Sequence, residues 1–172
     1  MAPKTRPAGY RIEPLAPSHD RAVFCSGVSE LDAYLQRQAA QDLKRNRAAV
    51  FVLTSDSKAI AGFYTLSAHS IQAAELPQDL SRKLPRFPLP VTLLGRMAVA
   101  QSLQGQGWGE FLLLHALERA LRGSQQVASW AAVVDAKAGA RDFYVKHDFI
   151  PSATQPNRLF LPMRSIEKMF EA

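Results

Sequence analysis

Three glycines in five residues, Gly105, Gly107 and Gly109, separate an apolar run that ends at Ala100 from a helical pattern that begins near Trp108. Because glycine has no β-carbon, another molecule can approach such a backbone closely, and several N–H groups can point outward together. The first turn of a helix also leaves about four N–H groups without intrahelical partners and carries roughly half a positive charge. The spacing predicts an anion site, most often a site for phosphate.

Two common nucleotide motifs do not fit this loop. A P-loop needs Lys and then Ser or Thr after its last glycine, whereas Gly109 is followed by Glu110 and Phe111. A dinucleotide fold needs G-x-G-x-x-G and an acidic residue about 20 positions later, where this chain has Ser129 and Trp130. From the loop alone, a plain glycine turn entering an ordinary helix stays an open alternative.

Apolar periodicity on both sides of the loop predicts alternating strands and helices. Strands are expected at residues 10–15, 48–54, 59–68, 93–100 and 127–134, followed by a closing hairpin of residues 149–150 and 158–163. Helical segments are expected at residues 29–43, 72–84, 108–121, 136–147 and 165–170. This alternation predicts an α/β layered fold with a mixed central sheet flanked by helices, and residues 1–172 are expected to form a single domain.

Two local signals refine these expectations. Ser29 is expected to cap the helix that starts there, with Asp32 completing a capping box. Prolines 85, 88 and 90 predict an extended segment that leads into the strand before the glycine loop.

The composition is that of an ordinary globular protein, with 47% hydrophobic and 21% charged residues. Cys25 is the only cysteine, so no intrachain disulfide or cysteine metal site is expected, and a reducing cytoplasmic setting is inferred. The segment Met1–Pro7 lacks an apolar signal core, and no later run approaches the roughly 18 apolar residues of a membrane span. We expect a protein that is neither exported nor embedded in a membrane, and no metal site.

An excess of basic residues, 21 against 15 acidic, gives a formal charge of +6 and favours polyanionic partners such as CoA or nucleic acid. The cations concentrate in two clusters, Lys44, Arg45 and Arg47, and Arg82, Lys83 and Arg86. Both clusters are candidate RNA-binding residues, and solvated helix ends remain the alternative interpretation.

The pattern Gln104-x-x-Gly107-x-Gly109, after a strand that ends Arg96-Met97-Ala98-Val99, resembles the acetyl-CoA pyrophosphate loop of the GNAT N-acetyltransferases. The resemblance implies that loop amides hold the pyrophosphate and that the strand backbone binds the pantetheine. It assigns the acetyl-CoA contacts to Met97, Ala98, Val99, Gln104, Gly105, Gln106, Gly107, Trp108, Gly109, Glu110 and Phe143. A later family signature, an aromatic pair on a helix, corresponds to Phe143 and Tyr144, although Asp148 stands where a glycine is usual.

Tyr144 is the candidate catalytic acid, because the resemblance places the matching tyrosine beside the acetyl-CoA sulfur. A phenol near pKa 10 is a reasonable proton donor to a departing thiolate whose thiol has a pKa near 8.5. The alternative is one more aromatic side chain in an amphipathic helix. No base is identified, since Glu75, Asp79 and Asp135 cannot be ranked, and His115 fits a packing role better than a catalytic one.

Further residues narrow the resemblance. Phe24-x-Ser-Gly27, Leu31-Asp32-x-Tyr34-Leu35 and Leu94-Gly-Arg-Met-Ala-Val99 are similar to the toxin branch of the family in bacterial type II toxin–antitoxin pairs, with Cys25-Ser26 in place of the usual Asp-Cys. That branch acetylates the α-amino group of aminoacyl-tRNA, blocks translation, commonly dimerises and is neutralised by a ribbon-helix-helix antitoxin. An α-amino group starts at a pKa of about 7.7–8.0 and needs little help from a base. A GNAT enzyme for small amines or protein amino groups, and a non-catalytic acetyl-CoA sensor, remain the alternatives.

Overall fold

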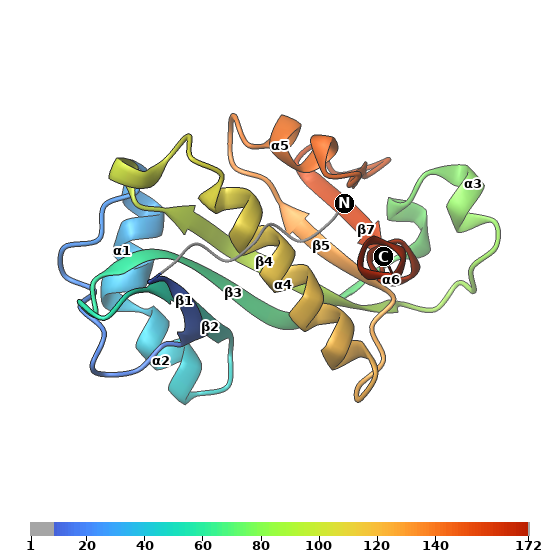
Figure 1. Cartoon of the computed structure of the whole chain (residues 1–172). Helices are drawn as coiled ribbons and strands as arrows, with labels where there is room; N and C mark the ends of the chain where they lie inside the picture. The colour runs from blue at the N-terminus through green and yellow to red at the C-terminus, as the bar shows by residue number, and fades with distance from the viewer. Residues whose placement is uncertain (1–8, 172) are drawn as a thin grey trace. The chain divides into compact units, whose positions relative to one another are not determined.

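The computed structural model, drawn in Figure 1, describes residues 9–171. These residues form two compact units. We call residues 9–67 with 95–116 the loop unit, because they include the glycine loop, and residues 68–94 with 117–171 the tyrosine unit, because they include Tyr144. The segment Met1–Pro7, expected to be short and polar, lies outside the described residues. Each unit is considered by itself below.

One sheet of seven strands has the order β1-β2-β3-β4-β5-β7-β6. The pairs β1–β2, β2–β3, β5–β7 and β6–β7 are antiparallel, and β4 and β5 pair in parallel. The predicted mixed sheet flanked by helices is therefore confirmed. The strands are β1 (Arg11–Pro14), β2 (Ala49–Thr54), β3 (Ile60–Ile71), β4 (Leu89–Val99), β5 (Ala131–Asp135), β6 (Ile150–Pro151) and β7 (Arg158–Pro162).

The loop unit packs α1 (Ser29–Arg37) and α2 (Ala39–Lys44) on a core with the hairpin of β2 and β3. Leu35 and Phe63 are fully buried in this core, and the Tyr34 ring stacks on Phe63 with centroids 6.2 Å apart. The nearly continuous apolar run of β2 is explained by this burial, because both faces of the strand are covered.

The tyrosine unit has its own core, which includes Ile71, Leu76, Val133 and Phe160. Its short helical elements are η1 (Ala73–Glu75), α3 (Gln78–Ser81), α5 (Arg141–Lys146) and α6 (Met163–Phe170). The predicted closing hairpin forms between β6 and β7, with Ile150 opposite Phe160. The proline segment, predicted to be extended, bends at Arg86 and Phe87. It becomes extended only in β4, which begins at Leu89 rather than at residue 93.

The helix predicted over residues 29–43 is interrupted at Gln38, whose backbone angles of φ −124° and ψ −30° end α1 before α2 begins. The predicted capping box at Ser29 is wrong, because Val28 occupies the N-cap position and no side chain caps the helix. Asp32 Oδ1 instead accepts hydrogen bonds from the backbone N–H of Ser26 at 2.9 Å and from its hydroxyl at 2.6 Å. The turn at Gly27, with φ +88°, brings Ser26 within reach of this carboxylate.

Two predicted boundaries are also too early. Strand β5 starts at Ala131 rather than at residue 127, because the N–H groups of Gln126 and Val127 both bond to the Gly123 carbonyl and close a turn. Helix α5 starts at Arg141 rather than at residue 136, because Gly139 has a φ of +85° and interrupts any helix there.

Gly62 provides a test of the close packing in the loop unit. A β-carbon at this position would lie 2.9 Å from Leu112 Cδ1 and 3.0 Å from the backbone oxygen of Ala98. Gly62→Ala is therefore expected to lower the free energy of unfolding by about 1–3 kcal/mol, as overpacking does. Gly123→Ala is the matched control: its β-carbon meets nothing within 4 Å, and it should stabilise the helix by about 0.5–1 kcal/mol. Urea unfolding of both variants measures the difference, and equal stabilities would contradict the packing argument.

Candidate active site

The predicted anion loop connects β4 to α4 (Trp108–Ser124) through the short helical turn η2 (Gln101–Leu103). Gly105 and Gly107 have φ angles of +79° and +89°, which explains the requirement for glycine at both positions. The N–H of Phe111 bonds to the Gly107 carbonyl at 3.1 Å, so the amides that precede it belong to the open first turn of the helix. This backbone has the arrangement of a phosphate site.

Gln104 holds the loop to the rest of its unit. Its side-chain amide donates to the Ser26 carbonyl at 2.7 Å and to the Val99 carbonyl at 2.9 Å. A parallel backbone bond joins the Gln101 N–H to the Cys25 carbonyl at 2.8 Å. The Gln104 amide is thus directed at protein carbonyls, where it holds the loop between Ser26 and Val99.

The other predicted acetyl-CoA contacts differ in exposure. Gln106 is exposed, while Met97, Val99, Gly107, Gly109 and Glu110 are half-buried. Ala98 is buried and packs into the core of the loop unit. The Trp108 ring is also buried, 4.7 Å from the ring of Tyr10 and 5.9 Å from that of Phe111, so this tryptophan offers a ligand its backbone rather than its ring.

Tyr144 lies on α5 in the tyrosine unit and is only 7% exposed. Its ring makes edge contacts with the rings of Phe143 and Phe149, with centroids 5.2 Å and 5.4 Å apart. Among residues 9–171 the hydroxyl has no hydrogen-bond partner, and burial raises the pKa of Tyr144 to about 12. A phenol in this environment carries its proton at every physiological pH, so the proton is present for transfer, while the same burial makes the phenol a weaker acid than a free one.

Asp148, where the family usually has glycine, follows α5 with a φ of +69°. This left-handed conformation explains the family's preference, since glycine adopts it without steric cost. Aspartate is among the few other residues that tolerate it, which accounts for the departure.

Two of the three carboxylates considered as bases, Glu75 and Asp135, are already engaged. Arg158 donates from Nε and Nη2 to the two carboxylate oxygens of Asp135, at 2.8 Å and 3.0 Å, and from Nη1 to Glu75 Oε1 at 3.0 Å. The hydrogen bonds to Asp135 raise the pKa of Arg158, in line with a stable ionic cluster. Asp79 is exposed on α3. Sequence reasoning named Glu75 and Asp135 but missed the arginine that joins them.

His115 Nδ1 lies 2.8 Å from the hydroxyl of the fully buried Tyr64, which agrees with the packing role expected for this histidine. No group of three His, Cys, Asp or Glu side chains suitable for a metal ion occurs within residues 9–171. In the same range, no helix has the length and apolar character needed to cross a membrane.

The two basic clusters belong to different units. Lys44 and Arg45 are exposed at the end of α2, whereas Arg47 Nε lies 3.0 Å from Oδ1 of the buried Asp42. Arg82, Lys83 and Arg86 are exposed after α3 in the tyrosine unit. All three residues of the second cluster and two of the first therefore keep their charge available to a partner.

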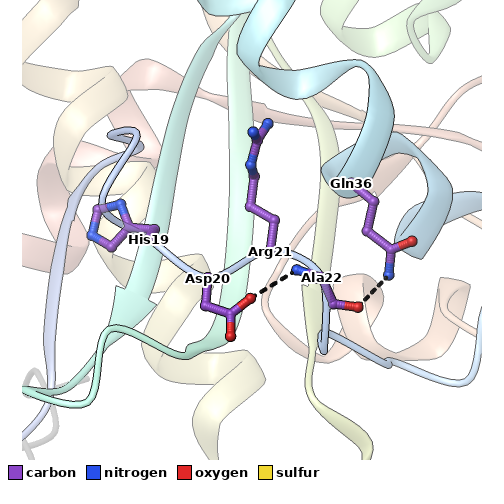
Figure 2. Close-up of a pocket in the computed structure, with 5 residues that line it drawn as sticks. All are labelled: His19, Asp20, Arg21, Ala22 and Gln36. Atoms are coloured by element: carbon purple, nitrogen blue, oxygen red, sulfur yellow. Dashed lines mark hydrogen bonds between the residues drawn. The ribbon is translucent and has the colours of Figure 1, made fainter.

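A pocket of about 380 Å³ in the loop unit was not expected from the sequence. It is lined by His19, Asp20, Arg21, Ala22 and Gln36 (Figure 2). Asp20 accepts the Ala22 N–H at 3.0 Å, and the Gln36 amide donates to the Ala22 carbonyl at 3.5 Å, so these polar groups stabilise the segment itself. None of the five residues belongs to the predicted acetyl-CoA or catalytic set.

Comparison with known proteins agrees with this geometry. Residues 46–151 match the family described as Acetyltransferase (GNAT) domain. The chain is 35% identical to a tRNA-acetylating toxin of Mycobacterium tuberculosis over 87% of its own length and 90% of the relative. It is similar to AtaT complexed with acetyl-methionyl-tRNA, with a TM-score of 0.88 and 30% identity over 94% of this chain and 99% of that one. It is also similar to a variant of the AtaT toxin bound to the C-terminus of the antitoxin AtaR and acetyl-CoA, with a TM-score of 0.82 and 27% identity over 95% and 99%.

Gln104→Glu tests whether this amide shapes the anion loop. The substitution keeps the size of the side chain but places a carboxylate against two carbonyl oxygens, so both hydrogen bonds are lost. If the binding free energy of acetyl-CoA falls by about 1–3 kcal/mol as a result, its affinity falls roughly 5-fold to 150-fold. Isothermal titration with acetyl-CoA measures the effect, and Gln125→Glu, an exposed position at the end of α4, is the matched control. Unchanged affinity of Gln104→Glu for acetyl-CoA would show that the loop holds its shape without the two hydrogen bonds of the Gln104 side chain.

Proposed function

The chain belongs to the GNAT family of acetyltransferases, and we propose that it transfers the acetyl group of acetyl-CoA to the α-amino group of aminoacyl-tRNA, which blocks translation. The observation that carries the proposal is the similarity, over 94% of the chain, to AtaT complexed with acetyl-methionyl-tRNA. The relative named tRNA-acetylating toxin supports the same substrate class.

The proposed reaction gives a role to the loop amides, to the backbone of β4 and to Tyr144. In the loop unit, the amides around Gly105 and Gly107 would bind the pyrophosphate of acetyl-CoA, and the backbone of Met97 to Val99 would bind its pantetheine. In the tyrosine unit, Tyr144 would donate the proton that the departing sulfur takes up. The amine nitrogen bonds to the acetyl carbon, the carbon–sulfur bond breaks, and the proton lost by the amine passes to water, from which the phenol is restored.

The engaged carboxylates suggest that deprotonation of the acceptor needs no dedicated base. Glu75 and Asp135 are both paired with Arg158. An α-amino group near pKa 7.7–8.0 has an appreciable neutral fraction at cellular pH, and esterification of the neighbouring carboxyl lowers this pKa further because a negative charge is lost. The choice of an aminoacyl ester as acceptor is consistent with this arrangement.

The proposed partners follow the toxin branch of the family. AtaT is seen with the antitoxin AtaR, and an antitoxin is proposed for this chain as well. We further propose that this antitoxin is of the ribbon-helix-helix type, that the enzyme is a homodimer, and that it acts in the cytoplasm, where charged tRNA and acetyl-CoA are available.

Transfer of labelled acetyl from acetyl-CoA to a charged total-tRNA pool tests the function, beside uncharged tRNA and free amines. Label on charged tRNA alone supports the proposal. Label on free amines alone would replace it with an enzyme for small amines, and acetyl-CoA binding without any transfer would indicate a sensor.

Tyr144→Phe tests the catalytic acid. Loss of the proton donor is expected to reduce kcat about 10²-fold to 10⁴-fold while the affinity for acetyl-CoA stays within about twofold. Tyr64→Phe is the control, because it removes a buried hydroxyl bonded to His115 and should leave kcat within about twofold. An undiminished kcat in Tyr144→Phe would assign Tyr144 to packing.

The pH dependence of kcat/KM gives a second test of the same residue. The rate should rise with pH as the acceptor amine loses its proton, with a midpoint at or below about 8. It should then stay level through pH 10.5, because burial raises the pKa of Tyr144 to about 12 and the acid stays protonated. A decline centred near pH 10 would indicate a donor with an ordinary phenol pKa.

Charge reversal at Lys44 and Arg45 tests the first basic cluster. The double variant Lys44→Glu/Arg45→Glu is expected to weaken tRNA binding about tenfold or more and to flatten its salt dependence, because fewer counterions are released. Acetyl-CoA affinity should not change. Arg47 is left out because its ion pair with Asp42 would confound the result. Equal loss of both affinities would contradict an RNA-binding role.

A further inference from the structure

Arg96, on β4 three residues before the end of the strand, is held in an unusual way. Its guanidinium carbon lies 3.7 Å from the centre of the Tyr34 ring, the geometry of a cation–π contact. Its backbone N–H donates to Thr65 Oγ1 at 3.1 Å, and a β-carbon on the preceding Gly95 would come within 3.0 Å of the same oxygen. The backbone of Gly95 and Arg96 thus packs closely against the Thr65 side chain, which holds the backbone of Arg96 in place.

The charge of Arg96 is not balanced within the described chain. Across residues 9–171 its guanidinium donates no hydrogen bond and forms no ion pair, although it is partly buried. Tyr34 does not supply a negative charge, because burial, followed by its hydrogen bond to Asp42, raises the pKa of Tyr34 to about 12. The nearby Asp42 carboxylate already accepts the Tyr34 hydroxyl at 2.9 Å and lies 3.0 Å from Arg47.

A guanidinium with five rigid N–H donors matches the oxygens of a phosphate, and its ring contact leaves those edge donors accessible. Within the loop unit, the pyrophosphate of acetyl-CoA is already assigned to the amides after Gln104. Side chains alternate along a strand, so Arg96 shares a face with Ala98, which packs into the same core cluster as Tyr34. The remaining phosphate of acetyl-CoA, on its adenosine ribose, lies at the opposite end of that molecule from the pantetheine that β4 would bind. The proposed tRNA acceptor, by contrast, carries backbone phosphates next to its reacting ester, so a phosphate at Arg96 fits the tRNA better than the donor.

Resting on the proposed function, we propose that Arg96 is a binding residue for a backbone phosphate at the single-stranded 3′ end of the acceptor tRNA, and that Tyr34 is the platform that positions it. The contact holds the terminal nucleotide, and with it the aminoacyl ester, in the loop unit.

The variants Arg96→Gln and Arg96→Lys test this proposal, with Arg37→Gln as matched control for loss of one positive charge on the same unit. Binding of uncharged tRNA is measured across salt concentrations, beside binding of the same tRNA lacking its last three nucleotides. For Arg96→Gln we expect about tenfold to hundredfold weaker binding of intact tRNA. The slope of the logarithm of the binding constant against the logarithm of the salt concentration should become shallower by about 0.7, because one contact to a single-strand phosphate is lost. Arg96→Lys should recover part of the affinity, because it keeps the charge and loses the bidentate geometry.

Shortened tRNA supplies the decisive comparison. Parent and Arg96→Gln should bind it equally, because the phosphate in question has been removed. An undiminished difference would place the contact elsewhere on the tRNA and overturn the assignment to the 3′ end. If Arg96→Gln loses no more affinity for intact tRNA than Arg37→Gln does, Arg96 does not bind a phosphate, and the proposal is overturned.

Kinetics distinguish the source of the phosphate. On charged tRNA, Arg96→Gln should raise KM for the tRNA and leave KM for acetyl-CoA within about twofold, which also shows that the variant is folded. A raised KM for acetyl-CoA alone would assign Arg96 to the donor and overturn the proposal. If the parent enzyme does not acetylate charged tRNA, the proposed function fails, whereas the binding comparison still decides on Arg96.

Discussion

The shape of the glycine loop depends on the two hydrogen bonds of the Gln104 side chain. Positive φ angles at Gly105 and Gly107 make the loop possible, but they do not select one conformation, because glycine is permissive in both directions. The Gln104 amide makes the selection by joining the end of β4 to the turn at Ser26. Asp32 holds the turn at Ser26, because its carboxylate accepts two hydrogen bonds from that residue. A carboxylate on α1 thereby determines how the amides of a distant loop are presented.

Burial has opposite consequences in the two units. Around Tyr144 it suppresses ionisation and leaves a neutral proton donor without any hydrogen-bond partner in the described chain. Around Asp42 it is compensated by the Tyr34 hydroxyl, which donates to one carboxylate oxygen, and by Arg47, whose Nε lies 3.0 Å from the other. The first arrangement is suited to chemistry because its proton is uncommitted. The second is suited to support, because removing the Tyr34 hydroxyl would leave a buried carboxylate oxygen without its donor.

Periodicity and glycine spacing were enough to predict the mixed sheet, the closing hairpin and the loop before α4, because these depend on local preferences and burial. The contacts that give the site its character were not predictable in this way. Arg158 joins Glu75, which lies 83 residues earlier in the chain, to Asp135, and Arg96 finds the ring of Tyr34 only when β4 and α1 meet in the fold. The capping box at Ser29 failed for a related reason: the pattern was present, but Asp32 had a better partner in Ser26.

The left-handed backbone at Asp148 has an evolutionary consequence. Codons for aspartate and glycine differ at a single base, and glycine would remove the steric cost of a φ of +69°. A single base change can therefore replace Asp148 by glycine and relieve the backbone strain next to α5. Proteins near their stability threshold accumulate substitutions that cost stability, and such a position can offset one of them without altering the fold. Sequence drift elsewhere in the tyrosine unit could thus be absorbed next to the residue proposed to deliver the proton.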